Sequence, residues 1–520
     1  MSENLKQEIQ ILINKYKYGD FSGVLNKCSL LVKKHPKNDF IWNLAGLSFQ
    51  HTGDNQNAIK SFQSAIHINP KNNSAKNNLA ISLKNNREYK KAEEILANLL
   101  KEKPDYFNAL VNLANLKNDT YFFDEAISLY KKAISINKDS PELYLNISTV
   151  LQTNNKMDEA RDYLFQALSL NKNFTKADQN LSMILNYKNE ENDEHFKNML
   201  DKLNNSNLSD LDKVQLYFGL GKAFEDKKDY ESSFKHFEQG NKINIKSKKS
   251  FIKHYQQLSK DLKNYFSKLD LKKIKKNNND DKKIFILGLP RSGTTLIEKI
   301  ISSHSKVSTV SEIEYLYKKI NQNIFKNQKF DENNTSMFIE QNIHEHYNDF
   351  LKFYNVKNTY IIDKTLTNFW YIGFIKIFFP NSKIIHSYRD PKDNCLSIYK
   401  NLFSNNEAWS YSEEQIGEYF LIYDDLMKFW NELFKNEIYN SKYEDIINDH
   451  EKKTKQLISF CGLEWEDNCL NHHKNNNPIK TLSINQANKP IYKTSINSSK
   501  FYSTKLSKLY SILDKLNASN

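Results

Sequence analysis

The 520-residue sequence is poor in cysteine, with four residues of this type: Cys28, Cys395, Cys461 and Cys469. They form no Cys-x-x-C pair, so neither a disulfide framework nor a zinc site is indicated. This scarcity fits a reducing compartment. The sequence also lacks an apolar run of about 18 residues, which excludes a membrane-spanning helix.

A secretory signal peptide is also missing from the start of the sequence. Residues 1–8 are mostly polar and lack a basic region followed by an apolar one. We therefore expect a cytoplasmic location. Hydrophobic residues make up 39% of the chain and aromatic residues 13%, which is enough for packed cores and excludes wholesale disorder. At this length more than one domain is expected.

The net charge of +13 could indicate nucleic acid or other anionic partners. Lysine and asparagine are abundant along the whole length, which is typical of compositional bias rather than of a basic patch. A dense basic run at 272–276 is followed by the polar stretch 277–281, and we interpret both as a solvated linker. We therefore expect no nucleic-acid partner, although the positive charge should help to attract a multiply anionic small molecule.

The N-terminal half repeats itself every 34 residues, a period typical of tetratricopeptide repeats. The period is carried by Pro36, Pro70 and Pro104, and by Ala58, Ala92, Ala126 and Ala160. Small residues such as Gly46 and Ala58 should let the two helices of a unit approach closely. Units are predicted at 5–38, 39–72, 73–106, 107–140 and 141–174, with a further helix from 175, a polar helix and loop at 187–213, and another unit at 214–247.

Stacked units of this kind form a superhelix with a concave surface. The preferred interpretation is a groove that binds a protein or peptide partner. A spacer or an oligomerisation stem stays open as an alternative, because a repeat array alone does not decide between them. We assign this all-α solenoid to residues 1–270.

The pattern changes after a linker at 271–282. Short apolar runs at 284–287, 360–362 and 383–386 alternate with helical stretches. This alternation predicts an α/β domain with a parallel sheet. We assign this second domain to residues 283–520.

Residues 283–304 predict a phosphate-binding, P-loop-like turn. A short apolar strand runs into a loop bounded by Gly288 and Gly293, and a helical apolar stripe follows. Backbone N–H groups of such a loop and the N-terminus of its helix both point at an anion. The common nucleotide-triphosphate loop ends in Gly-Lys-Ser/Thr. Here Thr294 follows Gly293 and Arg291 lies inside the loop, which disfavours an ordinary ATPase or kinase and indicates a different phosphorylated donor.

The segment 290–295, Pro-Arg-Ser-Gly-Thr-Thr, resembles the 5′-phosphosulfate loop of sulfotransferases that use 3′-phosphoadenosine 5′-phosphosulfate (PAPS). Within that superfamily it is most similar to the tyrosylprotein sulfotransferases and to bacterial relatives that carry tetratricopeptide repeats. The resemblance implies an enzyme that converts PAPS to 3′-phosphoadenosine 5′-phosphate (PAP) and needs no metal. It also implies that the 5′-phosphosulfate is bound by Arg291, Ser292, Gly293, Thr294 and Thr295.

The same resemblance implies the catalytic residues. Glu312 lies 21 residues after Arg291, where the tyrosylprotein branch has its general base; an ordinary solvated loop carboxylate is the alternative. Glu314 stands where that branch has an arginine that grips acidic substrate residues, which disfavours an acidic tyrosine motif as the acceptor. Lys364 follows the apolar run 360–362 and, with Arg291, would stabilise charge on the leaving phosphate.

Further residues are implied to hold the nucleotide. Arg389 ends a predicted strand, and Ser397 lies two helical turns later. The family uses this arginine and serine to grip the 3′-phosphate, and arginine suits forked phosphate contacts. Tyr443, in a Tyr-Glu-Asp segment, resembles a residue near the adenine. Ser483 and Lys500 match a nucleotide-covering loop and a late basic residue of the family, which implies that both contact the nucleotide.

Histidine serves as the base in other sulfotransferases, but His304 and His386 are interpreted as structural here. The sequence and the resemblance together predict an enzyme that moves a sulfuryl group from PAPS to an acceptor hydroxyl presented by the repeats. A protein tyrosine, a glycan, a lipid or a small metabolite could be the acceptor, and the oligomeric state is open. Two alternatives remain: a non-catalytic repeat scaffold with a nucleotide-binding domain, and an atypical kinase or other phosphate-loop enzyme.

Overall fold

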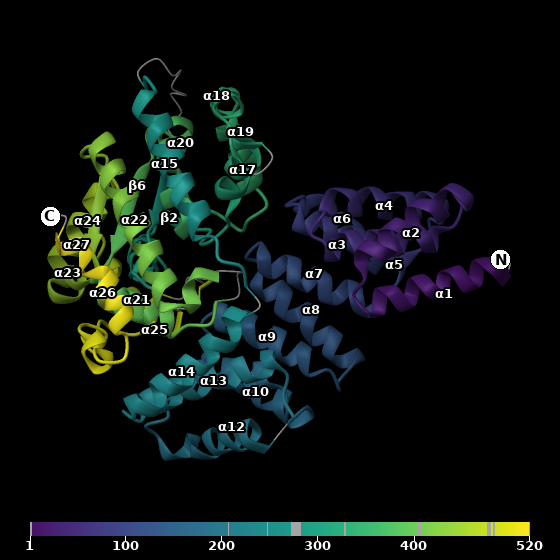
Figure 1. Cartoon of the computed structure of the whole chain (residues 1–520), viewed down its shortest axis with the longest axis horizontal. Coiled ribbons are helices and arrows are strands. Elements are labelled where there is room, and N and C mark those ends of the chain that lie inside the picture. The colour runs from purple at the N-terminus through teal and green to yellow at the C-terminus, as the bar shows by residue number, and fades with distance from the viewer. Residues whose placement is uncertain are drawn as a thin grey trace. The chain divides into compact units, whose positions relative to one another are not determined.

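The computed structural model describes residues 3–205, 207–246, 248–271, 282–326, 329–403, 408–475, 480–481 and 484–518 (Figure 1). It comprises two compact units, Met1–Val150 and Leu151–Asn520. The domain boundaries that the sequence places at residues 270 and 283 remain predictions, and most of the predicted linker lies outside the described residues.

The first unit consists of helix pairs that follow the predicted period. Its helices are α1 (Glu3–Lys17), α2 (Phe21–Lys34), α3 (Asp39–His51), α4 (Asn55–Ile68), α5 (Asn73–Asn85), α6 (Tyr89–Glu102), α7 (Phe107–Asp119), α8 (Phe123–Ile136) and the start of α9 (Pro141–Thr153). The side chains of Asn38 and Asp54 accept hydrogen bonds from backbone N–H groups in the first turns of α3 and α4. Such caps satisfy helix N-termini that would otherwise lack partners.

Small residues at the repeated positions let paired helices approach closely, as predicted. Ala58, Ala92 and Ala126 are fully buried. A Cβ placed on Gly46 would lie 2.5 Å from Cε1 of Phe62, so any larger residue would force α3 and α4 apart. The predicted helical solenoid is therefore confirmed.

The second unit begins with more helices. These are α10 (Met157–Leu170), α11 (Thr175–Ile184), the 3₁₀ turn η1 (Glu190–Asn192), α12 (Asp193–Asn205), α13 (Asp210–Asp226), α14 (Tyr230–Lys246) and α15 (Ile252–Lys268). The pair α13 and α14 corresponds to the unit predicted at 214–247. It repeats the packing of the first unit, since a Cβ on Gly221 would lie 2.6 Å from the ring of Phe237.

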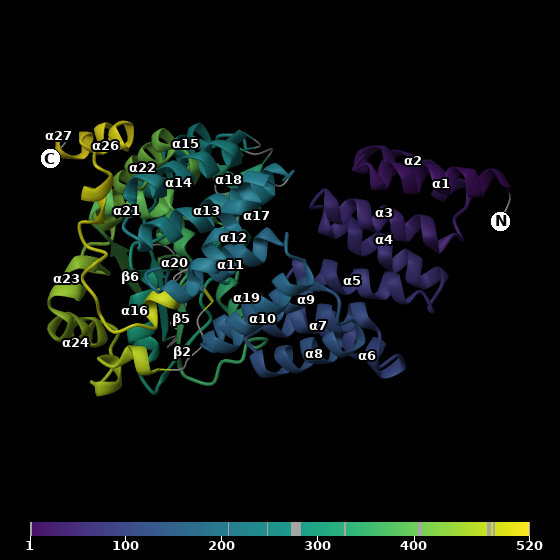
Figure 2. The ribbon, with the colours of Figure 1, turned by 90° about the horizontal axis from the view of Figure 1, so that it is seen from below.

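A five-stranded sheet follows in the same unit (Figures 1 and 2). Its strands are β1 (Lys283–Leu287), β2 (Val307–Thr309), β5 (Tyr360–Asp363), β6 (Lys383–Tyr388) and β7 (Ile438–Lys442). Their order is β2-β5-β1-β6-β7 and every pair is parallel. The predicted parallel α/β class is confirmed, with three strands where the apolar runs indicate them.

Both faces of the sheet are buried. Ile284 and Ile286 of β1 share one core with α16 (Thr294–Ser302), α23 (Tyr443–Asn448) and α24 (His450–Phe460). Phe285 points to the opposite face, as alternation along a strand requires, and its ring lies 6.4 Å from that of Tyr347 and 5.5 Å from that of Phe379. A strand covered on both faces is apolar throughout, which explains why the apolar run in the sequence predicts β1.

The remaining elements connect and cover the strands. They are α17 (Tyr315–Ile324), the hairpin β3 (Phe325–Lys326) and β4 (Lys329–Phe330), α18 (Glu332–Ile339), α19 (Ile343–Leu351), η2 (Leu366–Tyr371), α20 (Ile372–Phe378), α21 (Pro391–Tyr399), η3 (Ala408–Tyr411), α22 (Glu413–Leu433), η4 (Asp467–Cys469), η5 (His472–Lys474), α25 (Ile484–Ala487), η6 (Ser498–Tyr502), α26 (Ser507–Leu513) and α27 (Lys515–Ala518). No helix within the described ranges is long and apolar enough to cross a membrane.

Candidate functional site

The carboxyl ends of all five parallel strands meet at one edge of the sheet. Each strand is followed by a residue that the sequence singled out. These residues are Arg291 after β1, Glu312 after β2, Lys364 after β5, Arg389 after β6 and Tyr443 after β7. Ligands of open α/β sheets bind outside this edge. The topology thus assembles residues that lie up to 152 positions apart in the sequence into one region.

The loop from Gly288 to Gly293 requires its two glycines. Gly288 has φ +144°, and a Cβ there would lie 2.2 Å from the carbonyl oxygen of Ser387. Gly293 has φ +100°, and a Cβ there would lie 2.6 Å from Cδ2 of Tyr443. Both positions combine left-handed φ with close approach, so no other residue fits without a shift. Immediately after the loop, α16 begins at Thr294 with its N-terminal N–H groups facing the same edge.

Side chains from neighbouring elements hold the loop in place. Ser387 Oγ donates a hydrogen bond of 2.9 Å to the carbonyl of Ser292, and Asn394 Nδ2 donates one of 2.8 Å to the carbonyl of Pro290. The hydroxyl of Ser292 is buried and has no hydrogen-bond partner among the described residues. A buried polar atom without a partner is rare in a folded protein, so the Ser292 hydroxyl is a candidate contact for a polar ligand.

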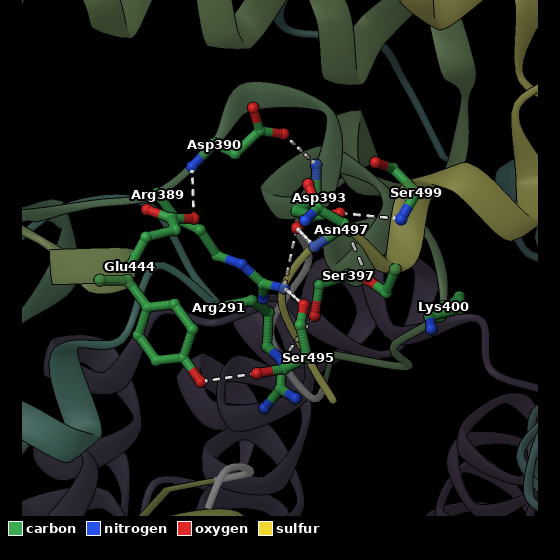
Figure 3. A network of polar contacts seen from close by, with 12 residues as sticks. Arg291, Arg389, Asp390, Asp393, Ser397, Lys400, Glu444, Ser495, Asn497 and Ser499 are labelled. Carbon is green, nitrogen blue, oxygen red and sulfur yellow. Dashed lines mark hydrogen bonds and ion pairs between the residues drawn. The ribbon is translucent and has the colours of Figure 1, made fainter. Parts of the chain in front are cut away.

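Two of the chain's four arginines meet beside this loop (Figure 3). Arg291 Nε donates to Ser397 Oγ at 3.1 Å, and its Nη2 donates to Gln486 Oε1 at 2.6 Å. The guanidinium of Arg389 lies 5.1 Å above the ring of Tyr443. We call Arg291, Arg389, Ser397 and Tyr443 the guanidinium cluster. Lysine supplies nearly all positive charge elsewhere in this chain, so the pairing of two arginines points to a need for forked hydrogen-bond donors.

The guanidinium cluster is set up electrostatically for an anion. Burial lowers the pKa of Arg291 to about 10, and the positive charge of Arg389 adds to the effect against an opposing contribution from Tyr492. Arg291 is still charged at neutral pH, so two like charges face each other. The Nε atom of Arg389 is buried and lacks a partner within the part of the chain that the structure describes. An anion between the two guanidiniums would relieve the repulsion and satisfy this donor.

Asp393 holds the segment 495–499, which we call the covering segment, across Arg389, and no sequence pattern indicates this role. Its carboxylate accepts hydrogen bonds from the backbone N–H groups of Asn497, at 2.6 Å, and Ser499, at 2.8 Å (Figure 3). The carbonyl of Ser495, just before that turn, accepts a hydrogen bond from Arg389. An acidic residue in the first turn of a helix such as α21 is common because it interacts favourably with the helix N-terminus. Only the structure therefore shows that Asp393 also binds the backbone at Asn497 and Ser499.

A second group, the lysine–carboxylate cluster, consists of Glu298, Glu312 and Lys364. Lys364 Nζ donates to Glu312 Oε1 at 2.6 Å and lies 3.4 Å from Glu298 Oε2. Lys364 and Glu298 are fully buried, whereas the side chain of Glu312 is 36% exposed. Burial alone would lower the pKa of Lys364, but the two carboxylates outweigh it and raise the pKa. The predicted base and the predicted lysine are therefore in direct contact.

Glu298 is the residue of this cluster that sequence reasoning missed. It lies on α16 between the apolar residues Ile297 and Ile300, and burial raises its pKa despite the nearby Lys364. A charged residue within the apolar stripe of a short helix was the available signal, because such a residue is seldom buried without a partner.

Some predicted site residues have partners other than the expected ones. Arg291, expected at the 5′-phosphosulfate with Lys364, contacts Ser397, which was expected at the 3′-phosphate. Thr295 Oγ1 lies 3.2 Å from Thr481 Oγ1 in the C-terminal covering region. Lys500 is exposed on η6. Ser483 lies outside the described residues, so its predicted contact stays a prediction.

The histidines interpreted as structural have protein partners. His386 lies between Asn440 and Tyr423, with its ring nitrogens 2.7 and 2.5 Å from their side-chain oxygens. Burial lowers the pKa of His386 to about 4, so it is neutral at physiological pH. His304 Nε2 lies 2.9 Å from the carbonyl oxygen of Glu464. Within the described ranges, no group of three His, Cys, Asp or Glu residues is placed to hold a metal ion.

Helices α13 and α14 contact the elements that carry the site. Glu225 of α13 accepts hydrogen bonds from Lys400, at the end of α21, and from the hydroxyl of Tyr502, the latter at 3.2 Å. Asn241 of α14 donates to the carbonyl of Tyr399 at 2.9 Å. These contacts fix α21, the helix that presents Ser397, against a repeat-like helix pair.

Comparison with known proteins agrees with this architecture. Residues 283–467 match the model of the sulfotransferase family, and this range contains both clusters. Residues 51–116 and 141–174 match tetratricopeptide repeat models. The chain thus combines tetratricopeptide repeats with a sulfotransferase-family domain. These matches do not single out the tyrosylprotein branch.

An uncharacterized protein from Aquifex aeolicus (strain VF5) is 30% identical over 318 residues, which cover 57% of this chain and 41% of that protein. The match thus spans less than half of the relative. Among solved structures, a tetratricopeptide repeat protein from Parabacteroides merdae is 18% identical, covers 46% of this chain and 94% of its own, and has a TM-score of 0.36. MamA from Desulfovibrio magneticus is 15% identical, covers 34% and 98%, and has a TM-score of 0.30.

Proposed function

We propose that this protein is a sulfotransferase that uses PAPS as donor and releases PAP. The observation that carries the proposal is the pair of buried donors without partners, Ser292 Oγ and Arg389 Nε, at the strand-end edge of a sulfotransferase-family domain. Ser292 belongs to the glycine loop and Arg389 to the guanidinium cluster, and a nucleotide with phosphates at its 3′ and 5′ positions would need both. The glycine loop supplies backbone N–H groups for one phosphate, and arginine supplies forked donors for the other.

Each cluster then has a role. Arg389 and Ser397 bind the 3′-phosphate, with Tyr443 packed beside the guanidinium. The loop residues Ser292 to Thr295 bind the 5′-phosphosulfate. When the 3′-phosphate binds Ser397, it displaces Arg291, which turns toward the 5′-phosphosulfate. Positive charge then stands at both phosphate-bearing ends of the nucleotide and stabilises it.

The lysine–carboxylate cluster carries out the chemistry. The acceptor oxygen attacks sulfur, the bond from sulfur to the 5′-phosphate oxygen breaks, and the electron pair stays on PAP. Glu312 accepts the proton of the acceptor hydroxyl, and its partly exposed side chain can reach an acceptor from solvent. Lys364 stabilises the charge that develops on the leaving phosphate.

The repeats are proposed to present a protein or peptide acceptor, since solenoids bind extended ligands on their concave face. Protein tyrosine is one candidate acceptor, and glycan, lipid and small-molecule hydroxyls are others. A cytoplasmic site of action remains part of this proposal.

The test is to incubate the purified full chain with ³⁵S-labelled PAPS and a cell extract and to look for a labelled product. We expect label transfer by the native protein and none by Glu312→Gln, while PAP binding by this variant, measured by calorimetry, stays within about threefold of native because the nucleotide pockets are intact. Binding of PAP without any transfer by the native protein would support a non-catalytic scaffold instead. Binding of ATP in preference to PAP would support a kinase-like enzyme.

A further inference from the structure

Glu298 is a buried carboxylate one turn after the glycine loop, and it is the member of the lysine–carboxylate cluster that takes no direct part in the proposed transfer step. It accepts a hydrogen bond of 2.5 Å from Thr309 Oγ1 and one of 3.4 Å from Ser311 Oγ. Its Oε2 lies 3.4 Å from Lys364 Nζ. These partners come from the ends of β2 and β5, so Glu298 is fixed from two strands while it faces the lysine.

The two carboxylates beside Lys364 differ in exposure to solvent. Glu312 has a side chain that is 36% exposed, whereas Glu298 and Lys364 are fully buried. Asp363 and Lys299 also interact electrostatically with Glu298. A buried ammonium is stable as a cation only beside a negative charge.

The proposed reaction removes one of these negative charges. When Glu312 accepts the acceptor's proton it becomes neutral, at the moment when Lys364 must be positive to stabilise the leaving phosphate. Glu298 makes no contact that this step breaks, because its partners are Thr309, Ser311 and Lys364. It is therefore the carboxylate that can remain ionised beside the lysine throughout.

We propose that Glu298 is a positioning residue that keeps Lys364 charged and aimed at the leaving phosphate while Glu312 changes its protonation state. This inference rests on the proposed sulfuryl transfer for its purpose, but the coupling between Glu298 and Lys364 does not depend on it. Glu298 itself touches neither the donor nor the acceptor.

The first experiment needs no ligand and is a double-mutant cycle on the full chain. The unfolding midpoints of the native protein, Glu298→Gln, Lys364→Met and the double variant are measured at pH 8. We expect the effects of the two single changes to be non-additive by about 3 °C or more. Glu298→Gln removes one of the two carboxylates that face Lys364, and Lys364→Met removes the cation that faces the buried Glu298. Additive effects would overturn the proposal even if the protein transferred no sulfuryl group.

The second experiment separates positioning from mere packing through the pH dependence of kcat. In the native enzyme the carboxylates hold the pKa of Lys364 above the ordinary lysine value of 10.5, so kcat should not fall on the alkaline side until beyond it. In Glu298→Gln we expect the alkaline limb to move down by about 1–3 pH units. An unmoved limb in a folded variant would overturn the proposal.

The matched control is Glu437→Gln, which removes a half-exposed carboxylate 2.5 Å from the largely buried Lys376. Glu437 precedes the amino end of β7 and so lies away from the carboxyl ends of the strands. This variant should leave the alkaline limb in place. If Glu298→Gln does not fold, Glu298→Asp retains the charge at a greater distance from the lysine and should move the limb in the same direction by a smaller amount. No movement in the aspartate variant would likewise overturn the proposal.

Discussion

The sharpest prediction concerns Arg389 and the phosphate that distinguishes PAP from adenosine 5′-phosphate. A hydrogen bond to a charged group contributes about 1.5–3 kcal/mol, and truncating one partner of a buried charge pair costs about 2–5 kcal/mol. The side chain of Arg389 is 8% exposed and its Nε lacks a partner among the described residues, so a 3′-phosphate there would be largely desolvated. We therefore expect Arg389→Gln to weaken PAP binding by about 2–4 kcal/mol, or about 30- to 900-fold.

The assay is isothermal calorimetry with PAP and with adenosine 5′-phosphate, which lacks the 3′-phosphate. The variant should bind adenosine 5′-phosphate within about threefold of native, because this nucleotide has no 3′-phosphate for Arg389 to bind. Arg161→Gln is the matched control, since Arg161 is 40% exposed on α10 and pairs with Asp158. Equal losses for both nucleotides would show that Arg389 acts through the covering segment at Ser495 and would refute its assignment to the 3′-phosphate.

Two further variants test the loop and the sheet edge. Gly293→Ala should cost about 1–3 kcal/mol of stability and abolish PAP binding, because its Cβ would strike Tyr443. Gly462→Ala is the control, because Gly462 has φ +72° and nothing within 4 Å of the added Cβ, so this variant carries the backbone strain alone. Equal PAP binding by both alanine variants would exclude this reason. Burial raises the pKa of Asp363 to about 6, so ionisation of this group lowers the stability of the native state as pH rises from about 4 to 6. The unfolding midpoint of Asp363→Asn should therefore rise relative to that of the native protein between these pH values. Above pH 6 the difference between the two midpoints should stay constant. A difference that stays constant from pH 4 to 7 would contradict that origin.

Much of the fold could be predicted from the sequence, because the helix pairs repeat at a fixed period and the inner strands are apolar runs. The 34-residue period predicts the helix pairs, since Ala58 and its equivalents must be small wherever two helices touch. Strands β1, β5 and β6 lie inside the sheet and read as apolar runs. Strands β2 and β7 do not, because both lie at the edges of the sheet. Strand β2 has three residues, and β7 mixes buried, half-buried and exposed positions.

The candidate site was predictable only where a residue follows a strand or sits in a recognisable loop. Glu312 and Lys364 are 52 residues apart in the sequence, yet they are in contact because β2 and β5 are neighbours in the sheet. Glu298 interrupts the apolar stripe of a short helix, which is a signal for burial, but its contact with Lys364 depends on packing that no local pattern encodes. The contact between Arg291 and Ser397 depends on side-chain orientation, which the sequence does not determine.

A crystal structure of the full chain with PAP and an unreactive acceptor analogue tests the central claim most directly. We expect the 3′-phosphate between Arg389 and Ser397, the 5′-phosphate on the backbone of residues 292–295 with Lys364 beside it, and the carboxylate of Glu312 within hydrogen-bond reach of the acceptor hydroxyl. PAP bound away from the strand-end edge, or Glu312 turned away from any hydroxyl, would contradict the proposed function.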